Sequence, residues 1–199
     1  MPVEFLTDDE AAAYGRYAGV PSQEELDRMF FIDDADRALI ARRRGDHTRL
    51  GLALQLTTVR YLGTFLPDPL DVPTAVLERL AGQLQIADPS CVKRYTERRT
   101  TPFEHREEIK AAYGLREFAE AEAEFAQWAR SRAWNTGQGP KTIFADGMRW
   151  LRFNAVLLPG VTTLARLVAR VRDEAMENLY ATLAGLPSPH QRAGFGEVA

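Results

Sequence analysis

Cysteine is nearly absent from this chain, and long apolar runs are absent too. The 199 residues contain a single cysteine, Cys91, so no disulfide can form within the chain and a reducing compartment fits. We expect Cys91 to be a small packed residue. No apolar run approaches the roughly 20 residues that a membrane-spanning helix needs. The N-terminus lacks the cationic start and apolar stretch of a secretory signal, so we expect a soluble, cytoplasmic protein.

Groups that carry catalysis or bind metal are also scarce. The three histidines, His47, His105 and His190, lie far apart in the sequence, and none has a second ligand at the spacing of a metal site. We expect each of them on the surface or in a loop. The glycines within residues 137–139 are followed by Pro140 rather than by the Gly-Lys-Ser/Thr of a phosphate-binding loop. The sequence therefore predicts no catalytic residue, no metal site and no cofactor.

Positive charge is gathered in a few places rather than spread along the chain. The net charge is −3 and the isoelectric point is near 5.7, which argues against a protein that coats nucleic acid generally. Local basic clusters are nevertheless enough for contacts with phosphate groups. Each cluster can instead be a solvated helix face. The clusters are Arg42, Arg43 and Arg44 with Arg49; Lys93 and Arg94 with Arg98 and Arg99; and Arg166, Arg170 and Arg172.

Helix signals run along the whole chain. Thr7 and Ser22 each stand three residues before a glutamate, which is the pattern of a capping box. Pro73 and Pro102 stand where a proline can open a helix. Within residues 48–61 the leucines alternate, which resembles a strand, but the length of the segment and the lack of a matching partner strand favour a buried helix. The patterns together predict an all-α protein.

Two apolar-patterned halves are separated by a charged stretch near residues 97–110. We predict a first helical module over residues 1–105 and a second over residues 106–185. The segment 186–199 is polar, contains glycines and has no period, so we expect it to be disordered. Each module is expected to contain a helix-turn-helix-like unit.

The first such unit falls at residues 80–95. An apolar helix is followed by a short turn and a segment rich in cationic and hydroxyl side chains, which is the layout of a helix-turn-helix that presents its second helix to DNA. Leu84, Ile86 and Val92 are expected to form the apolar seam between the helices. Gln85 occupies the turn position that glycine often holds. This arrangement leaves Ser90, Lys93, Arg94, Arg98 and Arg99 to face phosphates or base edges.

The second unit falls at residues 150–172. One helix ends, the chain turns, and a long helix is expected to start with Thr162 or Thr163 as its cap. Hydroxyl groups and the free backbone N–H groups of a helix start are good phosphate ligands. Arg166 and Arg170 are four residues apart and would share the face away from the leucine stripe. The alternative is an amphipathic helix with a solvated arginine face.

With these residues in view, the chain resembles the N-terminal region of Tn3-family transposases over about residues 2–185. The most distinctive landmark is the stretch Arg-Gly-Asp-His-Thr-Arg-Leu-Gly at residues 44–51, with its continuation Ala-Leu-Gln-Leu at residues 53–56. Further landmarks lie at residues 5–7, 63–65, 93–95, 157–160 and 164–166. In that family, this region is a set of helical modules that recognise the transposon's terminal inverted repeats.

The resemblance implies recognition of DNA without catalysis. Double-stranded DNA at the transposon ends would be the partner, a second transposase copy is a further candidate, and the bacterial nucleoid would be the location. Strand transfer belongs in this family to a much later, metal-dependent RNase H-like domain. This chain is expected to end before that domain, as a piece of a larger transposase or as a free-standing remnant. Arg42, Arg43, Arg44 and Arg49 would be flanking phosphate clamps.

A rival interpretation comes from another class of protein. The chain can be a helical protein-interaction module that serves transposase self-assembly, with only non-specific affinity for DNA. Its basic faces would then meet acidic surfaces of a partner.

Overall fold

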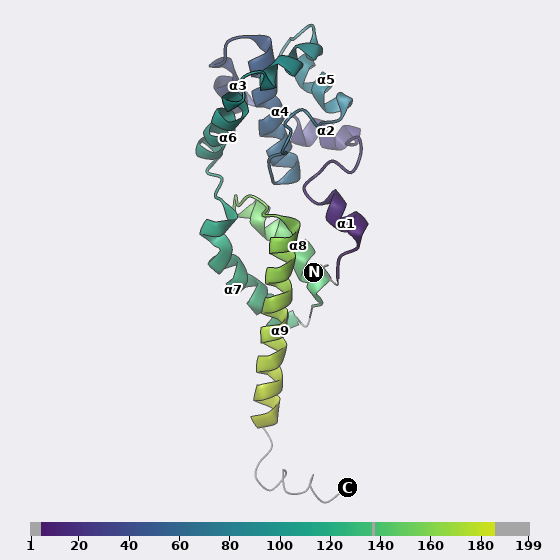
Figure 1. The fold of residues 1–199 in the computed structure, drawn as a ribbon, viewed down its shortest axis with the longest axis vertical. Coiled ribbons are helices and arrows are strands. Elements are labelled where there is room, and N and C mark those ends of the chain that lie inside the picture. Colours follow the sequence, from purple (N-terminus) through teal and green to yellow (C-terminus); the bar gives the residue numbers. More distant parts are fainter. Residues whose placement is uncertain (1–4, 137, 186–199) are drawn as a thin grey trace, which may run out of the picture.

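The computed structural model describes residues 5–136 and 138–185, and the regular elements within them are helices joined by turns and loops (Figure 1). Within these residues there is no strand, and the predicted all-α fold is confirmed. None of the described helices is long and apolar enough to cross a membrane. The elements are α1 (Asp8–Ala13), α2 (Gln23–Met29), α3 (Asp34–Ala41), α4 (Asp46–Leu62), α5 (Thr74–Gln83), the 3-10 helix η1 (Pro89–Thr96), α6 (Thr100–Tyr113), α7 (Phe118–Thr136), α8 (Pro140–Phe153) and α9 (Val161–Gly185).

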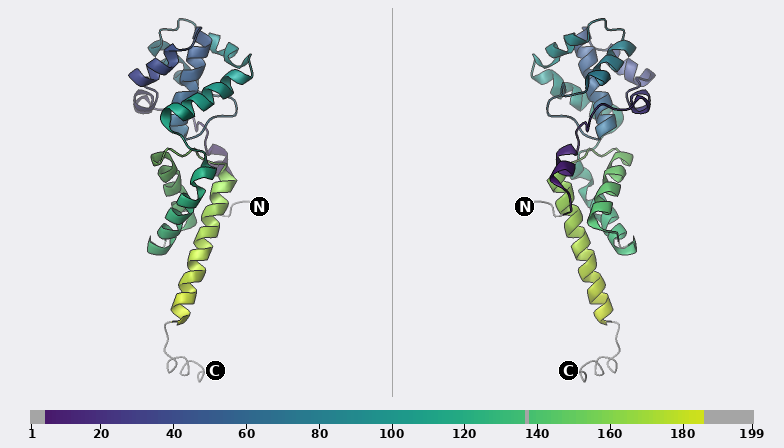
Figure 2. Two further views of the ribbon diagram at one scale, coloured as in Figure 1. Left: turned by 90° about the vertical axis from the view of Figure 1, so that its left-hand side faces the viewer. Right: turned by 90° about the vertical axis from the view of Figure 1, so that its right-hand side faces the viewer.

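Two hydrophobic clusters organise the packing of these helices. The first cluster draws on α2 to α6 with η1, which we call the first lobe. The second draws on α7, α8 and α9, which we call the second lobe. Figures 1 and 2 show the two lobes one beyond the other along the long axis, with the C-terminal half of α9 extending past its neighbours.

Helix α4 is the centre of the first lobe. Leu50, Leu52, Leu54 and Leu56 are each at most 2% exposed, although they alternate along a helix and therefore point in different directions. A helix can carry leucines on every side only where neighbours cover it all round, and α2, α3, α5, α6 and η1 do so here. The prediction of a buried helix over a strand is confirmed.

Local signals placed most helix starts correctly. The capping boxes at Thr7 and Ser22 are present, and Pro73 is the N-cap of α5. Helix α6 starts at Thr100, slightly before the proline that was expected to open it. Helix α9 starts at Val161, so the expected threonine caps are wrong and both threonines lie in its first turn.

The N-terminal helix packs with the second lobe rather than with the helices that follow it in sequence. Glu10 of α1 forms an ion pair with Lys141 of α8 at 2.6 Å, and the rings of Tyr14 and Phe144 lie 5.7 Å apart.

Ile109 of α6 belongs to the first cluster. The division into modules at residues 1–105 and 106–185 stays a prediction, and the expected tail at 186–199 lies outside the described residues.

Main-chain hydrogen bonds tie the two lobes together. The amide of Leu158, before α9, donates to the carbonyl of Gly63, at the end of α4, at 2.9 Å. The amide of Arg116, before α7, donates to the carbonyl of Ala155 at 2.9 Å, and the amide of Leu157 donates back to the carbonyl of Arg116 at 3.0 Å. Three segments far apart in the sequence therefore meet at this junction.

Candidate nucleic-acid interface

The segment η1, which follows the turn after α5, is a 3-10 helix and not the α-helix that the sequence suggested. The carboxylate of Asp88 accepts a hydrogen bond from the amide of Ser90 at 3.0 Å, which fixes the start of η1. Because a 3-10 helix has three residues per turn, Val92 and Tyr95 lie in line, and both are buried. Gln85 has a φ of 56°, so it adopts the left-handed turn conformation that glycine usually supplies. A helix-turn-helix unit is not confirmed here.

The apolar seam expected beneath this turn does form. Leu84, Ile86 and Val92 are buried at 6%, 6% and 5% exposure, and all three belong to the first hydrophobic cluster. Helix α4 makes the most extensive contact with η1. The seam therefore holds η1 against the centre of the first lobe.

A buried polar network, which sequence reasoning missed, fixes η1 on α4. Gly51 leaves space for the ring of Tyr95, because a Cβ atom at position 51 would come within 2.2 Å of that ring. The Nε2 group of Gln55 donates to the Tyr95 hydroxyl at 2.7 Å, and that hydroxyl lies 2.9 Å from Nδ1 of His105. The one available signal was that a glycine and a glutamine stand four residues apart on one face of an apolar helix.

The direction of these hydrogen bonds follows from their chemistry. An amide nitrogen only donates, so the Tyr95 oxygen accepts from Gln55 and donates its own proton to Nδ1 of His105. His105 then carries its proton on Nε2. The expectation of a surface histidine is wrong here, because His105 is 3% exposed and its burial lowers its pKa to about 4.

The predicted DNA-contacting residues of the first unit are all exposed. They are Ser90, Lys93, Arg94, Arg98 and Arg99. Arg94 lies 3.9 Å from Glu97, and Arg98 lies 3.2 Å from Glu104, so each has a carboxylate close by. Lys93 and Arg99 have no ion-pair partner among the described residues. The three-residue turn of η1 places Ser90 and Lys93 on one line of its surface.

The four arginines predicted as flanking clamps divide into two kinds. Arg42 and Arg44 are exposed and have no ion-pair partner within the described part of the chain. Arg43 is half-buried and pairs with Glu108 of α6, so it joins the loop after α3 to α6. Arg49 pairs with Asp46 at 3.1 Å and reaches the carbonyl of Leu84 at 3.4 Å.

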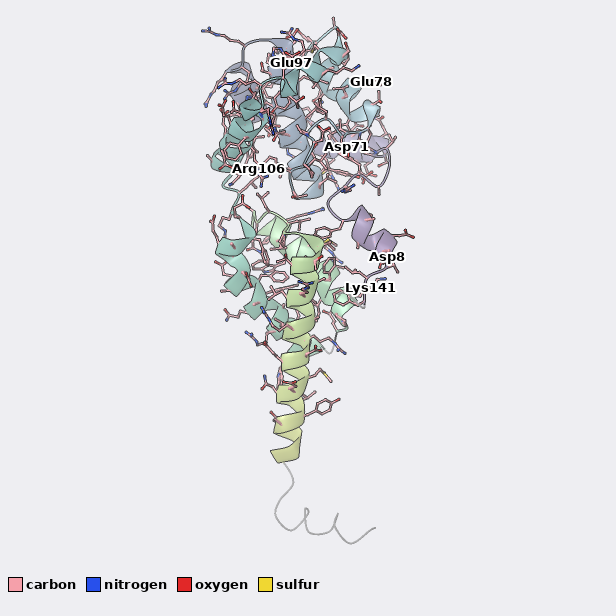
Figure 3. The ribbon with its side chains drawn as sticks, viewed as in Figure 1. Asp8, Asp71, Glu78, Glu97, Arg106 and Lys141 are labelled. Atoms are coloured by element: carbon pink, nitrogen blue, oxygen red, sulfur yellow. The ribbon has the colours of Figure 1, made fainter. Side chains whose placement is uncertain are left out.

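Contacts bring the clamp arginines and η1 to the same end of the first lobe. The bond from Arg49 to Leu84 joins the start of α4 to the end of α5, directly before the turn into η1. Figure 3 shows Glu97, which follows η1, at the end of the first lobe that lies farthest from α9. We call this surface, formed by Arg42, Arg44, Ser90, Lys93 and Arg99, the basic end.

The residues of the second predicted unit lie elsewhere. Thr162, Thr163, Arg166 and Arg170 are exposed on the first half of α9, in the second lobe. Arg166 has no ion-pair partner among the described residues, whereas Arg170 lies 4.0 Å from Glu122 of α7. The structure thus presents two separate groups of exposed cations, one on each lobe.

Cys91 is not an activated thiol. It is half-buried, and burial raises its pKa, with Asp46 and Asp88 acting in the same direction. Within residues 5–136 and 138–185, no three His, Cys, Asp or Glu side chains gather as they would around a metal ion. His190 lies outside the described residues.

Comparisons with known proteins place the chain in a family. A family model described as a domain of unknown function, DUF4158, matches residues 5–171. The chain is 45% identical over 200 residues to the transposase for transposon gamma-delta from Escherichia coli K12, covering all of this chain and 20% of that protein. It is 30% identical over 182 residues to the transposase for transposon Tn501 from Pseudomonas aeruginosa, covering 89% of this chain and 18% of that protein.

A third relative is similar over nearly the same part of this chain. The transposase for transposon Tn1546 from Enterococcus faecium is 27% identical over 183 residues, covering 91% of this chain and 18% of that protein. The chain spans about a fifth of the length of these curated relatives. It belongs to the DUF4158 domain family, and its resemblance to the N-terminal region of Tn3-family transposases is confirmed.

Proposed function

We propose that this chain is the non-catalytic, N-terminal part of a transposase and that it binds the terminal inverted repeats of a Tn3-type transposon. The observation that carries the proposal is the basic end, where exposed cations without ion-pair partners gather on a protein of net charge −3. The similarity to transposases supports DNA as the partner of these cations. The strand-transfer chemistry would reside in another part of the protein.

Charge pairing separates strong from weak candidates for contacts with DNA. A cation that already has a carboxylate within 4 Å must lose that pair, or share it, before it neutralises a phosphate. Arg42, Arg44, Lys93 and Arg99 avoid this cost, and we assign them the phosphate contacts of the first lobe. Ser90 shares a surface line with Lys93 and is assigned to the base edges, because a hydroxyl can both donate and accept hydrogen bonds there.

The start of α9 supplies a second contact region. Its first backbone N–H groups and the hydroxyls of Thr162 and Thr163 suit a phosphate, and Arg166 adds a cation one turn further along. Contacts from both lobes would extend the recognised DNA beyond the reach of one lobe. We place the protein in the cytoplasm, associated with the nucleoid.

The test is a titration of labelled duplexes at several salt concentrations. Chain 1–199 should bind a terminal-repeat duplex far more tightly than a scrambled duplex of equal length. The double variant Lys93→Ala/Arg99→Ala removes two phosphate contacts and should lower the salt slope by about 1.8, since each contact contributes about 0.9.

The matched control is Arg28→Ala/Arg130→Ala, which removes two exposed cations outside both contact regions. It should bind like the wild-type chain. If the first double variant keeps the wild-type slope, the assignment to the basic end is wrong. If terminal-repeat and scrambled duplexes bind within a few-fold of each other, the interaction-module alternative is favoured, and concentration-dependent self-association measured by sedimentation would support it.

A further inference from the structure

The junction between the lobes contains a pocket that the proposed DNA contacts do not use. It has a volume of about 380 Å³ and lies between the end of α1, the end of α4 and one side of α8. Its apolar lining includes Leu6, Leu62, Phe144, Met148 and Leu158. Figure 3 shows Lys141, which also lines it, at the side of the second lobe near α1.

Three hydrogen-bond donors at this pocket lack an anionic acceptor. The hydroxyl of Tyr14 is buried and has no hydrogen-bond partner among the described residues. Arg152 is exposed; it donates to the carbonyl of Leu62 at 2.9 Å and has no carboxylate partner within the same residues. Arg16 is exposed, and its side chain has no partner there either. Of the three, only the Tyr14 hydroxyl is buried, and a buried donor without an acceptor costs free energy and calls for an explanation.

The charges around the pocket do not cancel. Arg16, Lys141 and Arg152 line it together with a single carboxylate, that of Glu10. Glu10 already pairs with Lys141 at 2.6 Å, which leaves both guanidinium groups uncompensated. Burial lowers the pKa of Arg152, and the adjacent Tyr14 and Tyr61 hydroxyls oppose that shift. An anion in the pocket would pair with Arg152 and accept a hydrogen bond from Tyr14.

We propose that Tyr14, Arg16 and Arg152 form a binding site for an oxyanion, a phosphate or carboxylate group carried by a small apolar body. Oxygens of such a group accept from the Tyr14 hydroxyl and from both guanidinium groups, which bind planar or tetrahedral oxyanions through several N–H donors at once. The apolar body rests against Phe144 and Met148. This site depends on neither of the two groups of cations assigned to DNA.

The first test is thermal unfolding of chain 1–199 with inorganic phosphate, deoxyadenosine monophosphate or benzoate, each compared with chloride at equal ionic strength. A ligand at ten times its dissociation constant should raise the melting temperature saturably, by about 3–6 °C for a chain of this size. Arg16→Gln should lose most of this shift, because it removes one of the two guanidinium groups that bind the anion. The variant should still fold, since the Arg16 side chain has no partner among the described residues. Arg28→Gln carries the same charge change on α2, away from the pocket, and should keep the full shift.

A second variant separates ligand binding from folding. Tyr14→Phe removes only the unpaired hydroxyl, so it should raise the melting temperature without ligand and reduce the shift with ligand. A melting temperature that is no higher in phosphate than in chloride overturns the proposal. So does a shift of equal size in Arg16→Gln and Arg28→Gln, because a general salt effect would act on both alike.

Duplex DNA identifies the source of the oxyanion. If the group is a phosphate of the DNA backbone, Arg16→Gln lowers the affinity for a duplex and inorganic phosphate competes with it. If the group is a free small molecule, Arg16→Gln binds the duplex as tightly as the wild-type chain while losing the phosphate shift. A failure of sequence-specific DNA binding leaves the phosphate shift measurable, so the two proposals fail separately.

Discussion

Gly51 tests whether the Tyr95 network determines the stability of the first lobe. A Cβ atom at this position would lie 2.2–2.5 Å from three atoms of the Tyr95 ring, far inside van der Waals contact. Because Tyr95 is 1% exposed and packed on all sides, its ring cannot shift slightly and must leave its site. The Gly51→Ala variant therefore loses the buried ring together with its hydrogen bonds to Gln55 and His105.

Two effects of this substitution oppose each other. Alanine in a helix interior is more stable than glycine by about 1 kcal/mol. Displacing a fully buried aromatic side chain costs about 3–5 kcal/mol. The balance is a loss of about 2–4 kcal/mol in the free energy of unfolding, which should lower the urea midpoint by about 1 M or more.

Gly82 of α5 provides the matched control, because a Cβ atom there would meet no atom within 4 Å. Gly82→Ala should therefore stabilise the chain, by up to about 1 kcal/mol. In a Tyr95→Ala background the ring is gone, and Gly51→Ala should then cost nothing. The reasoning is refuted if Gly51→Ala raises the urea midpoint as Gly82→Ala does.

Two further outcomes concern buried charge. The carboxylate of Asp36 is fully buried and accepts two hydrogen bonds from Arg60 at 2.8 Å and one from Tyr113. Asp36→Asn should therefore lower the free energy of unfolding, measured by urea titration, by about 3 kcal/mol. A loss below about 1 kcal/mol would contradict this expectation. His105 titrates near pH 4 when folded and near 6.5 when unfolded, so the unfolded chain binds a proton first as pH falls. Stability should decrease from pH 6.5 to pH 4, by about 3 kcal/mol in total, and His105→Gln should flatten this dependence; an equal slope in both chains would refute it.

Most of the secondary structure could be predicted because its signals are local. A capping box at Ser22 or a proline at position 73 acts within one turn of the helix that it starts. The burial of α4 could be predicted from the length of the segment and its alternating leucines, which on a helix lie on more than one side and must be covered by neighbours. The 3-10 form of η1 could not, because it depends on fitting Tyr95 against Gly51, which lies 44 positions earlier in the chain.

The candidate site could be predicted only in part, because local sequence identifies charged residues but not their distant partners. Sequence clusters identified the cations, and the exposure of Lys93 and Arg99 agrees with their placement on a surface. The partner of Arg43 could not be foreseen, because Glu108 lies 65 residues away and only the tertiary fold brings α6 beside the loop after α3. The pocket beside Tyr14 could not be predicted from the sequence, because its lining residues are far apart in the chain and meet only when the two lobes are packed together.

The seam between the lobes has a consequence for how freely this region can vary in sequence. The bonds that join residues 63, 116, 155, 157 and 158 run between peptide groups, which every amino acid except proline supplies alike. These main-chain bonds help to set the orientation of one half of the molecule relative to the other, but side chains still limit variation here, because Gly63 has a φ of 81° and Leu157 and Leu158 are buried. Proline in place of Arg116, whose side chain belongs to neither cluster, would remove the donor to Ala155 and weaken that alignment without removing a core side chain.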